Sequence, residues 1–141
     1  MLVRCLYASR ATELMATTEL DRILEKSRRN NLACGITGLL CYRNGVFVQV
    51  LEGGRERVSA LLCALYSDTR HTALQLLLLD EINERHFGSW NMGKVSIDAV
   101  NDAVLLKYSE KAELDPFSVS GHSTLALLIE LASAGSIANR P

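Results

Sequence analysis

Hydrophobic and polar positions alternate, or recur at helical spacing, through most of this 141-residue chain. Strict alternation is typical of a half-buried strand, whereas apolar residues three and four positions apart are typical of an amphipathic helix. Asn44-Gly45 separates two of the predicted strands, and this dipeptide favours a tight hairpin turn. The patterns predict seven elements in the order β-α-β-β-α-β-β, at residues 2–9, 18–31, 37–42, 46–52, 55–67, 74–79 and 90–95.

Two β-α-β crossovers around a central hairpin describe an α+β, ferredoxin-like fold, in which both helices cover the same face of the sheet. The strand at 46–52 is apolar on both faces, because Val48 and Val50 alternate with Phe47 and Leu51. A strand of this kind is usually covered on both sides. A further part of the chain must therefore cover the second face.

Residues 96–141 contain two candidates for this cover. Ile97, Val100, Val104 and Tyr108 form one helical stripe, and residues 125–132 predict a helix that is apolar nearly all round. We expect these two helices to lie on or near the open face of the sheet, although the second could instead pack on a partner. The chain would then divide into a domain at 1–95 and a C-terminal helical extension at 96–141.

Composition narrows the function classes. Fifteen basic and sixteen acidic residues give a net charge of −1, without the basic excess that binding to nucleic acid or anionic membranes requires. The four cysteines form no C-x-x-C pair and lie mostly among aliphatic residues, as expected in a reducing compartment. With no signal-peptide pattern and no apolar stretch of about 18 residues, we expect a cytoplasmic protein. No nucleophile set, phosphate loop or spaced metal cluster supports an enzyme or a metal site.

Polar side chains nevertheless interrupt the apolar faces. Gln49 lies mid-strand, either bonded to the backbone at a sheet edge or paired with a specific partner. Tyr7 is either a core aromatic or that partner, because the strands at 2–9 and 46–52 are neighbours in a ferredoxin-like sheet. Asn31 shares a helix stripe with Ile23 and Ser27, and is either an ordinary cap or a group that faces the sheet.

The end of the second predicted helix adds another polar group. Asp68, Arg70 and His71 form either a local salt bridge or a contact for a phosphate or hydroxyl. Ile23 and Leu65 would face each other from the two helices and leave a slot over the sheet. A flat ligand with hydrogen-bonding edges would suit this slot.

Six motifs along the chain are informative when they are taken together. They are Tyr7-Ala8-Ser9, Asn31, Gly35-Ile36-Thr37-Gly38-Leu39-Leu40, Phe47-Val48-Gln49-Val50-Leu51-Glu52-Gly53, Asp68-Thr69-Arg70-His71 and Arg85-His86-Phe87-Gly88-Ser89-Trp90-Asn91-Met92. The combined motifs, which are far more specific than any one alone, resemble the BLUF domain, a flavin-binding sensor of blue light, over about residues 1–95.

The resemblance implies that FAD is held noncovalently between the two helices. Tyr7 matches the tyrosine that gives an electron and a proton to the excited flavin, and Gln49 matches the glutamine whose amide rearranges next to flavin N5 and O4. Trp90 and Met92 match a pair of which one packs near the glutamine, and strand alternation predicts that both share a face. The cofactor-binding set implied in this way is Tyr7, Ile23, Ser27, Asn30, Asn31, Gln49, Leu65, Asp68, Arg70 and His71.

The resemblance also implies a signalling route. The length leaves no room for an output enzyme after residue 95, so we expect a short stand-alone sensor that signals through the last strand and the C-terminal helices to a downstream protein partner. The apolar tail favours a homodimer or higher homo-oligomer. The alternative function is a ferredoxin-like adaptor or small-ligand-binding module without photochemistry, which a colourless protein would indicate.

Overall fold

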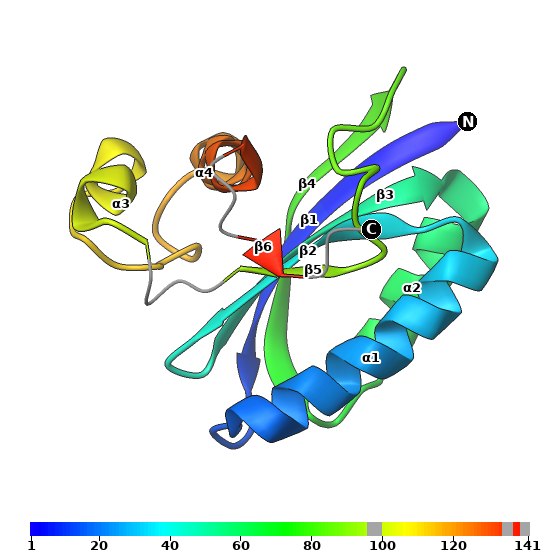
Figure 1. Ribbon diagram of the computed structural model, residues 1–141, viewed down its shortest axis with the longest axis horizontal. Helices are drawn as coiled ribbons and strands as arrows, with labels where there is room; N and C mark the ends of the chain where they lie inside the picture. The colour runs from blue at the N-terminus through cyan, green and yellow to red at the C-terminus, as the bar shows by residue number, and fades with distance from the viewer. Residues whose placement is uncertain (96–99, 134–136, 139–141) are drawn as a thin grey trace.

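The computed structural model describes residues 1–95, 100–133 and 137–138, and it places pairs of helices on opposite faces of a mixed sheet (Figure 1). The described strands follow the spatial order β4-β1-β3-β2-β5-β6. Helices α1 and α2 cover one face, and α3 and α4 lie on the other (Figure 1). The bounds are β1 Leu2–Ala11, α1 Thr17–Cys34, β2 Thr37–Arg43, β3 Val46–Gly54, α2 Arg55–Tyr66, β4 His71–Ile82, β5 Gly93–Val95, α3 Asp102–Tyr108, α4 Gly121–Ser133 and β6 Ile137–Ala138.

The first four strands form the antiparallel order β4-β1-β3-β2 that defines the ferredoxin-like arrangement, which confirms the predicted fold. β1 and β3 are central strands of the sheet. Both are buried on both faces, since their side chains alternate between two apolar clusters. Cys5 and Tyr7 pack under α1 and α2, whereas Leu6 and Ala8 pack towards the C-terminal helices. Among the described residues, no helix is both long and apolar enough to cross a membrane.

Local backbone signals account for the β2–β3 turn and for the end of α1. Asn44 and Gly45 both have positive φ, at 51° and 78°, as a type I′ turn requires. α1 continues about one turn beyond its predicted end at Asn31. It stops at Cys34 because Gly35 adopts the left-handed conformation, with φ 69°, and its N–H bonds to the carbonyl of Asn31.

The C-terminal helices cover the second face of the sheet, as predicted. Leu105 of α3 and Leu127 and Leu128 of α4 are buried against a cluster that includes Val48 and Val50 of β3. The leucine-rich side of α4 is therefore used within the chain. Ile97, which the stripe pattern placed in the first tail helix, lies outside the described residues.

The last predicted strand is shorter than expected, and this corrects one placement. β5 begins only at Gly93, so Trp90 and Met92 lie in the bent segment before it. Trp90 packs in the cluster beneath the C-terminal helices, whereas Met92 packs in the cluster beneath α1 and α2. The prediction that these two side chains share a face is wrong, because strand alternation does not apply outside a strand.

Candidate functional site

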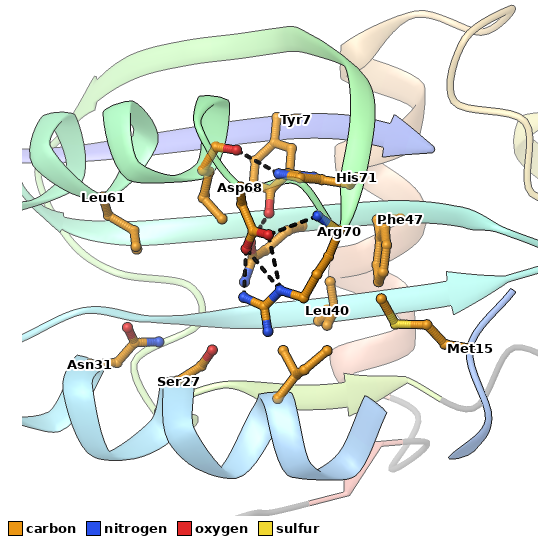
Figure 2. Close-up of a pocket in the computed structure, with 13 residues that line it drawn as sticks. Tyr7, Met15, Ser27, Asn31, Leu40, Phe47, Leu61, Asp68, Arg70 and His71 are labelled. Carbon is orange, nitrogen blue, oxygen red and sulfur yellow. Dashed lines mark hydrogen bonds and ion pairs between the residues drawn. The ribbon is translucent and has the colours of Figure 1, made fainter. Parts of the chain in front are cut away.

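A cavity opens between α1, α2 and the sheet (Figure 2). Aliphatic, aromatic and thioether groups form most of its walls, and polar groups lie at its floor and open side. The lining residues are Tyr7, Met15, Ile23, Ser27, Asn31, Leu40, Phe47, Gln49, Leu61, Leu65, Asp68, Arg70 and His71.

Tyr7 and Gln49 meet at the cavity floor because they are direct partners in the β1–β3 register. The Tyr7 hydroxyl donates a hydrogen bond to Gln49 Oε1, and Gln49 Nε2 donates to Met92 Sδ at 3.1 Å. Gln49 is 7% exposed and lies on a central strand, so the alternative of a backbone contact at a sheet edge is wrong. Burial raises the pKa of Tyr7 well above its usual value, which keeps the phenol protonated.

His71 joins three elements beside this pair. Its Nε2 lies 2.6 Å from the carbonyl oxygen of Leu65 and its Nδ1 lies 2.8 Å from Ser9 Oγ. A carbonyl only accepts, so Nε2 carries the proton in the neutral ring and Nδ1 accepts from the Ser9 hydroxyl. The Tyr7 and His71 rings meet edge to face, with centroids 6.4 Å apart. The contacts tie α2 and β4 to β1 at the cavity wall.

Asp68 and Arg70 occupy the side of the cavity that reaches solvent (Figure 2). Arg70 Nε lies 2.9 Å from Asp68 Oδ1 and 3.1 Å from Oδ2. The hydrogen bonds from Arg70 lower the pKa of Asp68 to about 2, and the same contact raises the pKa of Arg70. The local salt bridge, one of the two predicted alternatives, is therefore present, and both residues line the cavity, whereas the contact for a phosphate or hydroxyl stays a prediction.

One face of α1 holds the segment that precedes β5. Asn31 Nδ2 donates to the carbonyl of Asn91 at 2.9 Å, and Arg28 Nε donates to the carbonyl of Met92 at 2.9 Å. Asn31 is therefore not a helix cap; it faces the sheet. Asn30 is exposed on α1 and is not among the lining residues, whereas Ser27 and Ile23 are.

Sequence reasoning missed four lining residues: Met15, Leu40, Phe47 and Leu61. Leu40 is the direct partner of Gln49 in the β2–β3 register, and Leu61 lies one helical turn before Leu65. Periodicity could therefore have found both. Met15 lies between β1 and α1, where no periodic signal exists.

The lining fits a flat heteroaromatic ring. Aliphatic residues on the helices, such as Ile23 and Leu65, can pack against ring faces, and buried donors and acceptors at Tyr7, Gln49 and Asn31 can meet polar ring edges. Among the described residues there is no group of three or more His, Cys, Asp or Glu that could hold a metal ion. The site is therefore suited to an organic chromophore such as a flavin.

Comparison with known proteins agrees with this geometry. The family model described as sensors of blue light using FAD matches residues 2–93. Among curated proteins, photoactivated adenylate cyclase subunit beta of Euglena longa is 36% identical over 87 residues, which are 61% of this chain and 10% of that protein. The blue light- and temperature-regulated antirepressor BluF of Escherichia coli K12 is 29% identical over 119 residues, 81% of this chain and 30% of that protein. The chain thus spans only about a tenth of the cyclase subunit it matches.

Two solved structures are similar over nearly their whole length. BlsA in its photo-activated state has a TM-score of 0.82 at 30% identity, covering 100% of this chain and 99% of that chain. The dark-state structure of BlrB, a BLUF protein, has a TM-score of 0.77 at 31% identity, covering 94% and 96%. Both alignments extend past the matched family region into the C-terminal helices.

Proposed function

Because this chain belongs to the BLUF family and is a blue-light sensor that uses FAD, we propose that Tyr7 and Gln49 carry its photochemical response. The single observation behind this proposal is the buried series of hydrogen bonds from Tyr7 through Gln49 to Met92. When bound, FAD supplies the absorption of blue light and an acceptor for one electron and one proton. The sensing part of the chain is not itself an enzyme.

The cavity residues would hold the flavin ring in complementary ways. Ile23 and Leu65 would pack against the ring faces, and the buried amide of Asn31 would bond a ring edge. Asp68 and Arg70 would lie towards the solvent-exposed side. We extend the same proposal to Ser27 and His71, which line the cavity, and to Asn30, which is exposed on α1 beside Asn31.

Tyr7 is suited to release an electron and a proton together. Its raised pKa keeps the hydroxyl proton in place in the dark, and that proton points at Gln49 Oε1. A phenol that loses an electron becomes strongly acidic, so the electron and the proton leave together and both return to the Tyr7 oxygen in the dark.

Gln49 is suited to hold a changed set of hydrogen bonds after the light reaction, because its amide has two unlike ends, an acceptor oxygen and a donor NH₂. A half-turn of the amide would point Nε2 at Tyr7 and Oε1 at Met92. Met92 sulfur is only a weak acceptor and cannot donate to that oxygen, so its contact with Gln49 would be lost. The rearrangement therefore frees Met92 from the cavity floor.

The segment at 90–92 can carry this change through the sheet. Met92 packs on the flavin side, and Trp90, two residues earlier, packs beneath α3 and α4. A displacement of Met92 would thus pull on a side chain that contacts the C-terminal helices. We propose that residues 1–95 sense light and residues 96–141 relay the change to a downstream protein partner.

Two further parts of the proposal concern the setting of the protein. All four cysteines are free thiols, and burial raises the pKa of Cys5 to about 11 and of Cys41 to about 12. Free cysteines, of which Cys5 and Cys41 are buried, support a reducing, cytoplasmic setting. We also propose that the chain forms a homodimer or higher homo-oligomer, which light scattering in the dark and under blue light would test.

The deciding experiment is absorption spectroscopy of the FAD-loaded protein. Blue light should shift the flavin spectrum to the red, and darkness should reverse the shift. Tyr7→Phe and Gln49→Leu should each retain FAD and lose the shift, whereas Tyr66→Phe, at an exposed position on α2, should behave as wild type. A colourless protein that refuses FAD, or a normal light response in both cavity variants, would contradict the proposal.

A further inference from the structure

A charged residue is fully buried on the face of the sheet that the flavin cavity does not use. Glu52 follows Gln49 by three positions on β3 and therefore points to the opposite face. Its Oε2 lies 2.8 Å from Arg4 Nε and 2.7 Å from Arg4 Nη2. Placing a carboxylate in a dry interior is costly unless every oxygen is paired, so its remaining partners indicate its role.

Those remaining partners lie in the loop between β4 and β5. The main-chain N–H of His86 donates to Glu52 Oε2 at 3.1 Å, and the N–H of Phe87 donates to Oε1 at 2.6 Å. Arg85 anchors the same loop through Thr37 Oγ1 at 2.8 Å and the carbonyl of Gly35 at 2.7 Å. The loop is therefore fixed to the sheet at three consecutive residues.

This loop leads directly into the segment that contacts Gln49. The N–H of Trp90 donates to the carbonyl of Phe87 at 3.4 Å, and the carbonyl of Trp90 accepts from Gly38 N–H at 2.9 Å. β5 itself pairs with β2 over only three residues, so the sheet contributes little to the register of the segment. The path of the 90–92 segment, which lies outside any strand, therefore depends on the contacts of the loop that precedes it.

We infer that Glu52 is a positioning residue for the light response, because its bonds to the loop amides determine that Met92 lies beside Gln49 while Trp90 packs beneath the C-terminal helices. The inference rests on the proposed function of Gln49. Glu52 does not line the flavin cavity, so it acts only through the loop. It forms the fixed end about which the 90–92 segment moves.

Two substitutions separate positioning from simple stabilisation. Glu52→Gln keeps the shape but replaces one acceptor oxygen by an NH₂ group, which cannot accept from a main-chain N–H. Whichever way this amide lies, it loses either the Phe87 bond or the bonds to Arg4 and His86. The matched control is Arg4→Met, which removes the ion pair and leaves both loop amides bonded to Glu52.

The first measurement is acrylamide quenching of tryptophan fluorescence in the dark, on FAD-loaded protein. Trp90 is the only tryptophan in the chain, so the signal reports the anchored segment alone. Glu52→Gln should load FAD as wild type does, yet its Trp90 should be quenched several-fold more efficiently. Arg4→Met should lower the unfolding temperature without changing Trp90 quenching.

The second measurement is dark recovery after a blue-light pulse. Glu52→Gln should recover more slowly by roughly tenfold, the change that about 1.4 kcal/mol of barrier height gives, because a loosened segment no longer holds Met92 where it accepts from Gln49 in the dark orientation. Arg4→Met should recover at the wild-type rate. If Glu52→Gln does not load FAD, the same measurements on Glu52→Asp, whose shorter side chain cannot reach Arg4 and both amides together, decide the question.

The outcomes distinguish the two proposals. Wild-type quenching and recovery in the Glu52 variant, or equal effects in the Arg4 variant, would overturn the positioning role. A wild-type protein without any light response would overturn the proposed function instead. Trp90 quenching requires no photochemistry, so it would still test whether Glu52 places the segment.

Discussion

At the scale of single residues, the dark state depends on which way the Gln49 amide points. Its oxygen accepts from Tyr7 and its nitrogen donates to Met92. The Tyr7 hydroxyl could also accept, whereas the Met92 sulfur cannot donate, so Met92 is the neighbour that favours this orientation. A buried amide N–H without an acceptor costs about 1–3 kcal/mol. Met92 therefore stabilises the dark orientation although its sulfur is a weak acceptor.

Met92→Leu tests this stabilisation with little change in volume. The variant removes the acceptor for Gln49 Nε2 and so destabilises the dark orientation relative to the light orientation. We expect dark recovery to slow several-fold while FAD content stays unchanged, as measured from the decay of the red-shifted flavin absorption. Met15→Leu is the matched control, because Met15 also lines the cavity, whereas the sulfur that accepts from Gln49 Nε2 is that of Met92. Equal recovery rates in both variants would contradict the role of Met92.

Residue-level reasoning identified the polar centre of the site but not its surroundings. Alternation put Tyr7 and Gln49 on neighbouring strands with their alternatives open, and the family resemblance singled out both; the structure shows that they meet because both lie inside long central strands. Met15 and Met92 lie in irregular segments, where hydrogen bonds to distant residues determine the backbone path. Such contacts, like that from Arg28 to the Met92 carbonyl, leave no periodic trace in the sequence.

At the scale of elements, the Asp68–Arg70 ion pair closes the turn between α2 and β4. Arg70 N–H also donates to Asp68 Oδ1 at 2.9 Å, so the pair fixes the backbone at the solvent-exposed side of the cavity. The folded-state pKa of Asp68 is lowered from 3.8 to about 2. Its contribution to stability is therefore present above pH 3.8 and is lost as the pH falls towards 2.

Asp68→Asn should therefore be destabilising near neutral pH, and its difference from wild type should narrow as the pH falls from 3.8 to about 2. Urea unfolding of the FAD-loaded protein at a series of pH values measures this difference. In an Arg70→Met background, the same substitution should lose most of its pH dependence, because the hydrogen bonds that lower the Asp68 pKa are gone. A pH dependence that persists in the Arg70→Met protein would show that another group lowers the Asp68 pKa.

The elements themselves follow from local signals wherever those signals are strong. The Asn44-Gly45 hairpin and the left-handed Gly35 that ends α1 each depend on the backbone freedom of a few residues. β5 is different, because three residues of pairing with β2 follow a loop that Glu52 and Arg85 hold in place. The length of this strand depends on tertiary contacts, and the sequence pattern at 90–95 therefore overestimated it.

At the scale of the whole molecule, the two apolar clusters lie on opposite faces of the same sheet. Val48 and Val50 face α4, while Gln49 between them faces the flavin cavity. Within the 90–92 segment, Trp90 packs in the cluster beneath α3 and α4, and Met92 packs in the cluster beneath α1 and α2. A change at Gln49 thus has a short physical path to α3 and α4.

This path predicts that light alters the stability of the C-terminal helices. Hydrogen exchange followed by mass spectrometry, in the dark and under continuous blue light, should show faster exchange in peptides covering α3 and α4 when light is on. The same peptides in Gln49→Leu should exchange equally in both conditions, because the amide that displaces Met92 is absent. Peptides covering α2 serve as the internal control, since Val58 and its neighbours on α2 pack in the cluster opposite that of Trp90 and α4. Unchanged exchange across residues 100–133 in the illuminated wild type, in the presence of a normal spectral shift, would separate the photochemistry from the helices and rule out this relay.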